Sequence, residues 1–290
     1  MLAEVMVFKY PFWVALLISI VCGIVGTLVY ANRLTFLAGG ISHAAYGGIG
    51  LGIFLGVHVM FTTLIYTIVA SVIIGILSIC NREKTDSIVG LLWAGGMAFG
   101  IILLDLTPGY HTDIMSYLFG SIMLVSFNSF IYMSILTSFI LIMVLINYHK
   151  FVIISYDEEY AYTRGINVKN LYILMFILIG IAVVMMIQLV GIVLVIALLS
   201  IPPYLASFHS RSLKEMMIFS TIWCAIFNIL GIYLAYVLNI SSGAAIIAVG
   251  IVITIFFLLL RSIWMKGVCY MKKDKNKKEK SFFKGLFILW

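Results

Sequence analysis

The sequence predicts an all-α protein: a polytopic transmembrane helical bundle of about eight or nine spans, with one short cytoplasmic helix. Its 290 residues have a mean hydropathy of +1.19, and only 10% of them are charged. Soluble globular domains contain about 25% charged residues, so this composition excludes a soluble fold. Apolar runs recur from end to end, and each span needs roughly 20 residues. We therefore expect residues 1–265 to form a single domain within the membrane.

Polar breaks divide the N-terminal half into spans. Asn81–Ser87 contains four charged residues, and Pro108-Gly109 is a turn signal. Ile114–Ser126 is too short and too polar to cross the membrane, so a short or re-entrant helix is expected there. Full spans are expected at Phe12–Ala31, Thr35–Val57, Met60–Cys80, Ile88–Leu106 and Phe127–Tyr148.

The C-terminal half contains one unusually long apolar run, Leu171–Ala206, which has room for two spans. A sharp turn is expected near Gln188–Gly191. Pro202-Pro203 is expected to end the second span, because proline lacks the amide donor that a helix interior needs. Two further spans are expected at Met216–Leu238 and Gly243–Leu260. If the first segment or the 171–206 pair does not cross fully, the number of spans falls from nine to eight.

Lysine and arginine predict the orientation. None occurs within residues 85–149, 170–210 or 215–260, and each gap contains one expected outside loop, so the basic clusters face the cytoplasm. Seven of the 18 Lys and Arg lie in Lys272–Lys284. The net charge of +7 thus belongs largely to a basic cytoplasmic tail, residues 266–290. Attraction to anionic membrane lipids explains such a tail, and no nucleic-acid partner is expected.

The second span is rich in glycine and alanine. Gly40, Ala44, Gly48, Gly52 and Gly56 recur every four residues, so a helix places them along one face. A face of small residues allows another helix backbone to approach closely, which is how helices pack within a membrane. We expect this face to be a helix-packing surface.

His43 lies within the same glycine-rich span. An ionisable side chain is costly in hydrocarbon and marks a candidate functional site. One interpretation is that His43 lines a pore or binds a ligand; the other is that it only hydrogen-bonds to a neighbouring helix. No Gly-Lys dipeptide, H-E-x-x-H or G-x-S-x-G occurs in the chain, so a P-loop and the common hydrolase motifs are absent. An enzyme is not expected, and energy for active transport would come from another subunit.

A charged segment between two spans predicts the short cytoplasmic helix. Asp157 can cap its start, Glu158 and Glu159 suit its first turn, and Gly165 can end it. Presented on an inner loop, such a helix suits a groove on a soluble motor protein. The alternative is an ordinary solvated loop with one helical turn.

Several short motifs, in order along roughly residues 30–260, resemble the zinc/manganese permease family of ABC importers. They are Ser42-His43-Ala44 with Gly47-Gly48, Pro108-Gly109-Tyr110 with Asp113 and Met115–Gly120, Glu158–Gly165, and Gln188–Gly191 leading to Ala197–Pro202. The resemblance implies a bacterial cytoplasmic-membrane permease, homodimeric or pseudo-dimeric. It also implies two cytoplasmic ATPase subunits that bind ATP and an extracytoplasmic metal-binding protein that delivers the ion. No permanently bound cofactor is implied.

The resemblance also assigns roles to individual residues. It implies that His43 lines the path of the metal ion, and that the segment from Asp157 to Gly165 is the ATPase-coupling helix. The coupling residues implied are Asp157, Glu158, Glu159, Ala161, Arg164 and Gly165. His111 and Asp113, in an outside loop, are candidates for steering a cation or contacting the delivery protein, with a plain solvated loop as the alternative.

One departure from the family bears on the choice of metal. Many members carry an aspartate four residues before the histidine, where this chain has Gly39. Imidazole suits zinc, whereas carboxylate oxygen is favoured by manganese, so the departure favours zinc. Weak coordination still suits a channel, because a tightly held ion cannot leave. Two copies of His43 across a homodimer axis would supply such weak coordination.

We therefore expect the permease subunit of an ATP-driven importer of zinc or manganese, working by alternating access. One alternative is an ABC permease for a chelated metal or a vitamin. Others are a secondary transporter driven by an ion gradient and a membrane scaffold that transports nothing.

Overall fold

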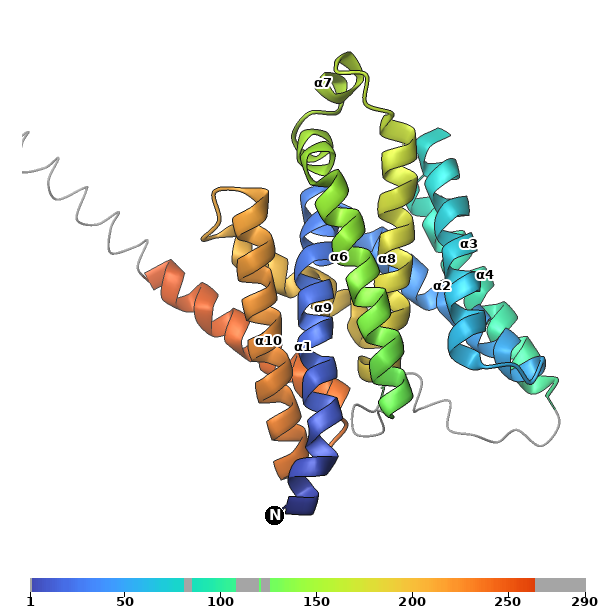
Figure 1. Ribbon diagram of the computed structural model, residues 1–290, viewed down its shortest axis with the longest axis vertical. Helices are drawn as coiled ribbons and strands as arrows, with labels where there is room; N and C mark the ends of the chain where they lie inside the picture. The colour runs from blue at the N-terminus through green and yellow to red at the C-terminus, as the bar shows by residue number, and fades with distance from the viewer. Residues whose placement is uncertain (1, 81–84, 108–119, 121–125, 264–290) are drawn as a thin grey trace, which may run out of the picture. The chain divides into compact units, whose positions relative to one another are not determined.

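The computed structural model describes residues 2–80, 85–107, 120 and 126–263, and every regular element within them is a helix (Figure 1). The all-α prediction is confirmed. The helices are α1 (Leu2–Ala31), α2 (Thr35–Phe54), α3 (Val59–Cys80), α4 (Thr85–Asp105), α6 (Phe127–Tyr156), α7 (Glu158–Thr163), α8 (Val168–Val190), α9 (Ile192–Ser207), α10 (Leu213–Leu238) and a last helix, Ser242–Ile263.

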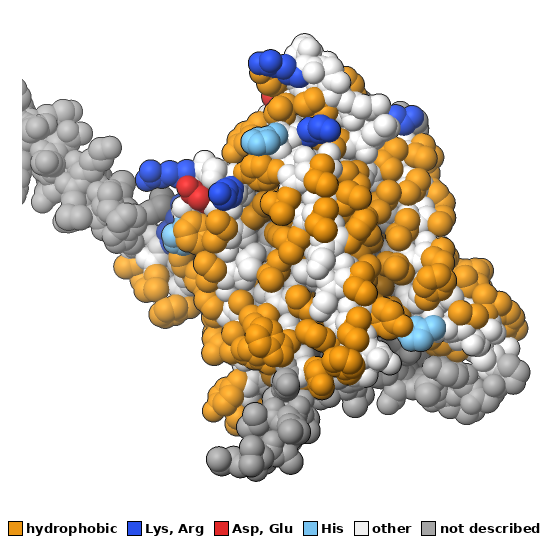
Figure 2. Space-filling model, in the orientation of Figure 1, with side chains coloured by type: hydrophobic (Ala, Val, Ile, Leu, Met, Phe, Trp, Pro, Cys, Tyr) orange, Lys and Arg blue, Asp and Glu red, His pale blue; other side chains and the backbone are white. Residues whose placement is uncertain are grey.

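Eight of the described helices are long and apolar enough to cross a membrane. The helix α9 has 16 residues and so rises about 24 Å, short of a hydrocarbon core of about 30 Å. The expected number of eight or nine spans is therefore confirmed: the described residues contain eight long spans, and the expected ninth is the shorter helix α9. Figure 2 shows apolar side chains covering the flanks of the helices, with Lys and Arg toward the end that carries α7. By the distribution of these basic residues, that end faces the cytoplasm.

The predicted turn within Leu171–Ala206 is present, and Gly191 forms it between α8 and α9. Its φ of 82° and ψ of 165° belong to a region that is essentially restricted to glycine. The short helix α9 can therefore begin in a new direction immediately after α8 ends.

The prediction that Pro202-Pro203 ends this segment is wrong, because α9 continues through both prolines to Ser207. Proline removes one helical hydrogen bond, leaving the carbonyl four residues earlier without its donor. A neighbouring helix compensates by packing tightly there: a methyl group at Gly26 of α1 would lie 2.9 Å from the carbonyl oxygen of Leu199. Burial against α1 holds the helix together where its own hydrogen bonds are missing.

The helix α2 is the most enclosed of the membrane helices, with 78% of its span buried. It contacts α4 most extensively, and their backbones meet at glycine. A methyl group at Gly96 of α4 would lie 2.7 Å from the Cα of Ala44, and one at Gly100 would lie 2.5 Å from the carbonyl oxygen of Tyr46. Side chains larger than hydrogen would force these two helices apart.

The expected packing face of α2 is shared between two neighbours. Gly40 and Ala44 face α4, whereas a methyl group at Gly48 would lie 2.7 Å from the Cα of Thr63 on α3, and Gly52 also packs against α3. Gly56 departs from the expected face. The helix ends at Phe54, and Gly56 takes a left-handed φ of 65° in the following turn, with no atom near enough to contact a methyl group there.

Two compact units make up the chain, residues 1–249 and 250–290. The first contains α1 to α10 and the start of the last helix. Within the described residues, the second consists of the rest of that helix, as far as Ile263. The basic tail expected at residues 266–290 lies outside the described residues.

Adjacent glycines on α4 provide a matched test of the α2–α4 contact. Gly96→Ala should destabilise the fold by about 1–3 kcal/mol, because the added methyl group collides with the α2 backbone. Gly95→Ala should be neutral or slightly stabilising, because nothing lies within 4 Å of the new methyl group and alanine favours a helix. Thermal unfolding of the two variants in detergent checks this. Equal melting temperatures would contradict the assigned contact.

Candidate functional site

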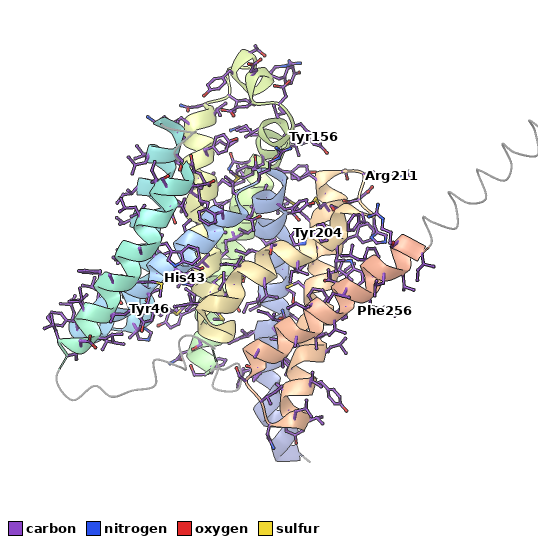
Figure 3. All side chains as sticks on the ribbon, turned by 180° about the vertical axis from the view of Figure 1, so that it is seen from behind. His43, Tyr46, Tyr156, Tyr204, Arg211 and Phe256 are labelled. Carbon is purple, nitrogen blue, oxygen red and sulfur yellow. The ribbon has the colours of Figure 1, made fainter. Side chains whose placement is uncertain are left out.

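His43 is the only Asp, Glu, Lys, Arg or His in the middle of a membrane helix within the described residues. His43 is the ninth residue of α2, and part of its side chain is accessible. Figure 3 shows it about midway between the two ends of the surrounding helices. An ionisable ring at this depth in a membrane span marks a candidate functional site.

An aromatic neighbour fixes the orientation of this histidine. The indole of Trp93, on α4, stacks on the imidazole with 4.2 Å between ring centroids and 8° between planes. The stack covers one face of the imidazole and leaves its edges, which carry both nitrogens. The Nδ1 atom is buried and has no hydrogen-bond partner among the described residues. A buried nitrogen without a partner is expected to meet water or a ligand.

The residue one helical turn before His43 is Gly39, and α9 fills the space beside it. A methyl group at Gly39 would lie 2.9 Å from the Cδ1 of Ile196. The carbonyl oxygen of Gly39 accepts a hydrogen bond of 2.7 Å from the Oγ of Ser42. The end of the Ile196 side chain therefore occupies space that a side chain at residue 39 would need.

His43 offers one potential metal ligand, its imidazole, which is partly accessible. Among the described residues, no group of three or more His, Cys, Asp or Glu could hold a metal ion. A lone imidazole fits a transported ion that passes through, and does not fit a resident metal, which needs about four ligands.

A second candidate site is α7, which lies beyond the ends of the membrane helices on the cytoplasmic side (Figure 1). The carboxylate of Asp157 caps the helix by accepting a hydrogen bond of 3.0 Å from the amide of Tyr160. Glu158 and Glu159 occupy the first turn, where negative charge stabilises a helix. Gly165 follows the end of the helix with a left-handed φ of 71°. The local structure is the one that the sequence predicts.

The surface of α7 is rigid and partly aromatic. Ala161 is fully buried and anchors the helix. The Nε of Arg164 donates a hydrogen bond of 2.7 Å to the hydroxyl of Tyr160, and its guanidinium lies 5.1 Å from the centre of that ring. Tyr162 is more than half exposed. Such a small, ordered surface is suited to docking in a groove of another protein.

Within the described part of the chain, the remaining candidates from the sequence add no residue to either site. His111 and Asp113 lie outside the described residues. His58 is exposed on the turn between α2 and α3, beside a cavity of about 540 Å3 lined by Ile49, Gly56, Val57, His58, Val59, Met60, Thr63, Val184 and Ile187. Its walls are largely apolar, so the cavity adds no second metal ligand to His43.

Comparison with known proteins settles the family. The model of the ABC 3 transport family matches residues 5–262. The chain belongs to the ABC 3 transport family. It is accordingly a membrane permease protein of a metal ABC transport system, with multiple spans in the cytoplasmic membrane.

Individual relatives cover nearly the whole of it. A membrane protein of Synechocystis sp., slr2045, described as uncharacterised, is 39% identical over 247 residues, covering 85% of this chain and 88% of its own. The manganese transport system membrane protein MntC of Listeria monocytogenes is 30% identical over 257 residues, with coverage of 88% and 90%.

A solved structure supports the same fold. PsaBC from Streptococcus pneumoniae, in complex with Fab, superposes with a TM-score of 0.78 at 26% identity, covering 88% of this chain and 95% of the other. The all-helical permease fold implied by the sequence motifs is therefore confirmed.

Sequence reasoning missed two residues that shape the His43 site, Trp93 and Ile196. Both come from helices distant in sequence, and nothing in their spacing relates them to residue 43. An aromatic residue in a membrane span is ordinary, so only the three-dimensional packing identifies them.

The cap of α7 can be tested directly. Asp157→Ala should destabilise α7 by about 1 kcal/mol, which corresponds to an amide hydrogen exchange about fivefold faster over residues 160–164. Asp157→Asn should exchange like the parent, because the amide oxygen can still accept the bond from Tyr160. Hydrogen-exchange mass spectrometry distinguishes them. Unchanged exchange in the alanine variant would show that the cap does not hold the helix.

Proposed function

We propose that this protein is the membrane subunit of an ATP-driven importer of divalent metal ions, with zinc as the cargo, and that the ion passes His43. The observation that carries the proposal is the unpartnered imidazole nitrogen in the middle of α2, in a chain of the ABC 3 transport family. A nitrogen lone pair in an otherwise apolar span gives a passing cation a ligand to exchange onto, and a single ligand releases it readily.

The chain contributes the path, and its partners contribute energy and delivery. ATP is bound and hydrolysed by separate cytoplasmic ATPase subunits, which dock on α7. An extracytoplasmic metal-binding protein hands over the ion at the opposite end. A second copy of the permease, in a homodimer, provides a second imidazole for the ion. The membership of the ABC 3 transport family supports these assignments, as do the names of relatives, which describe a metal transport system and a metal import system.

The helix order suggests how movement at α7 reaches the path. α7 connects α6 to α8 through short links, and α8 is joined to α9 by Gly191 alone. α9 in turn carries Ile196 to the space beside Gly39, one turn from His43. A displacement of α7 would tilt α8 and re-aim α9 about Gly191. Alternating access then consists of opening and closing the packing around His43.

Manganese is the second candidate cargo, and a specific observation favours it: several relatives at 28–30% identity have names that specify manganese. The donor set favours zinc. Imidazole is a good zinc ligand, whereas manganese favours carboxylate oxygen, and this chain has glycine at residue 39, with the end of Ile196 packed beside it.

The role of His43 is tested by a pair of histidine variants. His43→Ala should lower zinc uptake into cells at least tenfold, because the ion loses the only ionisable side chain that the described residues place in the middle of a membrane helix. His58→Ala removes the same side chain from an exposed turn and should leave uptake near the parent level. Uptake is measured by elemental mass spectrometry under metal limitation.

Two controls give this comparison its meaning. Both variants should still purify in a complex with the ATPase subunit, which shows that assembly is intact. Normal uptake by His43→Ala would remove His43 from the path. Uptake that persists when the ATPase is inactivated would instead support a gradient-driven transporter. If the cells lost uptake of a metal chelate or a vitamin and not of zinc, a permease for that larger cargo would be supported.

The choice of metal is tested by restoring a carboxylate. Gly39→Asp combined with Ile196→Val, which removes the blocking Cδ1, should shift uptake from zinc toward manganese severalfold when the two ions compete. Gly39→Asn with the same Ile196→Val change has matching shape and no charge, and should not shift it. Equal zinc-to-manganese ratios in the aspartate and asparagine variants would contradict the assignment of position 39 as a selectivity position.

A further inference from the structure

The short helix α9 has two unlike faces. Its only three hydroxyl side chains, Ser200, Tyr204 and Ser207, are spaced by four and three residues and so fall on one face with Ile196. All four side chains are partly accessible. The rest of the helix surface includes these buried, apolar residues: Val195, Leu198, Leu199, Pro202, Pro203, Leu205 and Ala206. Ala197 and Ile201, on the flank of this face, are partly accessible too. We call Ile196, Ser200, Tyr204 and Ser207 the hydroxyl face of α9.

This face begins beside the His43 site and ends at the cytoplasmic side. Ile196 lies against Gly39, which is one turn nearer than His43 to the start of α2. α9 then runs toward Ser207, which is followed by the basic residues Arg211 and Lys214. Figure 3 shows Tyr204 at a level between His43 and Arg211, the latter toward the end that carries α7. The hydroxyl groups therefore follow the direction that an imported ion must take.

The serine hydroxyl oxygens can accept hydrogen bonds or bind a cation. The Oγ of Ser200 donates a hydrogen bond of 2.7 Å to the carbonyl oxygen of Ile196. The Oγ of Ser207 donates one of 2.7 Å to the carbonyl oxygen of Tyr204. Each oxygen keeps its lone pairs for other groups. At the cytoplasmic end, the hydroxyl of Tyr30 on α1 lies 3.5 Å from the Oγ of Ser207. Neutral oxygens of this kind bind a cation weakly, as conduction requires.

The position of α9 argues against a lipid-facing role. The helix packs against α1, α2, α8 and α10, so four neighbours surround it. The helices with the most exposed apolar side chains are elsewhere; Leu145 and Ile146 of α6, for example, are 70% and 71% exposed. Accessible hydroxyls on an enclosed helix point to a polar space inside the protein.

We propose that the hydroxyl face of α9 lines the cytoplasmic exit route of the transported ion, and that Ile196 is the apolar barrier between His43 and that route. This inference rests on the proposed function, since it takes the ion to pass His43. Movement of α9 about Gly191 would carry Ile196 away from Gly39 and connect the imidazole to Ser200. The ion would then be handed from one hydroxyl to the next.

Reaction of introduced thiols with a charged methanethiosulfonate reagent tests the route. Ser200→Cys and Ser207→Cys are made in a chain whose four native cysteines are replaced by alanine, and the reagent is applied to the cytoplasmic side of inside-out vesicles. Both should react at least tenfold faster than Leu199→Cys, on the buried face of α9, and Ile142→Cys, on the exposed flank of α6. Zinc at saturating concentration should slow the reaction at Ser200→Cys.

Three results would overturn the proposal. Thiols at both positions that react no faster than Ile142→Cys would place the face against lipid. A disulfide between two copies of the Ser200→Cys chain, without reaction with the reagent, would place it in a subunit interface. Reaction at Ser207→Cys alone, in every nucleotide state of the ATPase, would end the route short of His43.

Transport by the complete complex in proteoliposomes provides a second measurement. Ser200→Ala should lower the maximal zinc uptake rate severalfold with little change in the half-saturating concentration, and Ser200→Thr should restore it. Ile196→Ala should permit zinc leakage without ATP. If His43→Ala stops uptake while none of these changes has an effect, the exit route fails and the proposed function stands. If His43→Ala transports normally, the ion does not pass His43, and the proposed path through this residue fails.

Discussion

Backbone-to-backbone contact between α2 and α4 is the constraint on which the rest of the site depends. In a membrane, burial from water cannot drive two helices together, so close van der Waals contact must do so. Gly96 and Gly100 allow α4 to lie directly on the backbone of Ala44 and Tyr46. This contact fixes the height and rotation of α4 against α2, and so brings Trp93 flat onto His43. The orientation of His43 is thus a consequence of glycine packing.

Rigid and movable parts are divided along the chain. α2, with α3 and α4 on its glycine surfaces, is tightly packed, which suits an element that holds the ion at a fixed place. α9 is short, contains two prolines, and is joined to α8 at one glycine whose backbone conformation other residues rarely adopt. It contributes the apolar contact at Gly39 and the hydroxyl face beyond it. The segment that we propose to move is therefore the one that, in this proposal, separates the histidine from the cytoplasm.

Much of the fold was predictable from sequence because hydropathy and turn residues act locally. The spans, the turn at Gly191, and the cap and end of α7 at Asp157 and Gly165 all depend on neighbouring residues. The prediction that the prolines end α9 failed because α1, through Gly26, stabilises the helix from outside. The partners of His43 were equally out of reach: Trp93 and Ile196 meet it only through the crossing of helices far apart in sequence. Resemblance of short motifs, and not physical reasoning alone, supplied the metal path and the family.

The most direct test of the central claim is zinc K-edge X-ray absorption of the purified permease–ATPase complex loaded with zinc and held in a nucleotide state that traps the ion. The account predicts imidazole nitrogen in the first coordination shell of the bound zinc, and its loss in His43→Ala but not in His58→Ala. A coordination shell without imidazole, or one unchanged by His43→Ala, would contradict the account, because the ion would then cross the membrane without contacting the histidine at the centre of α2.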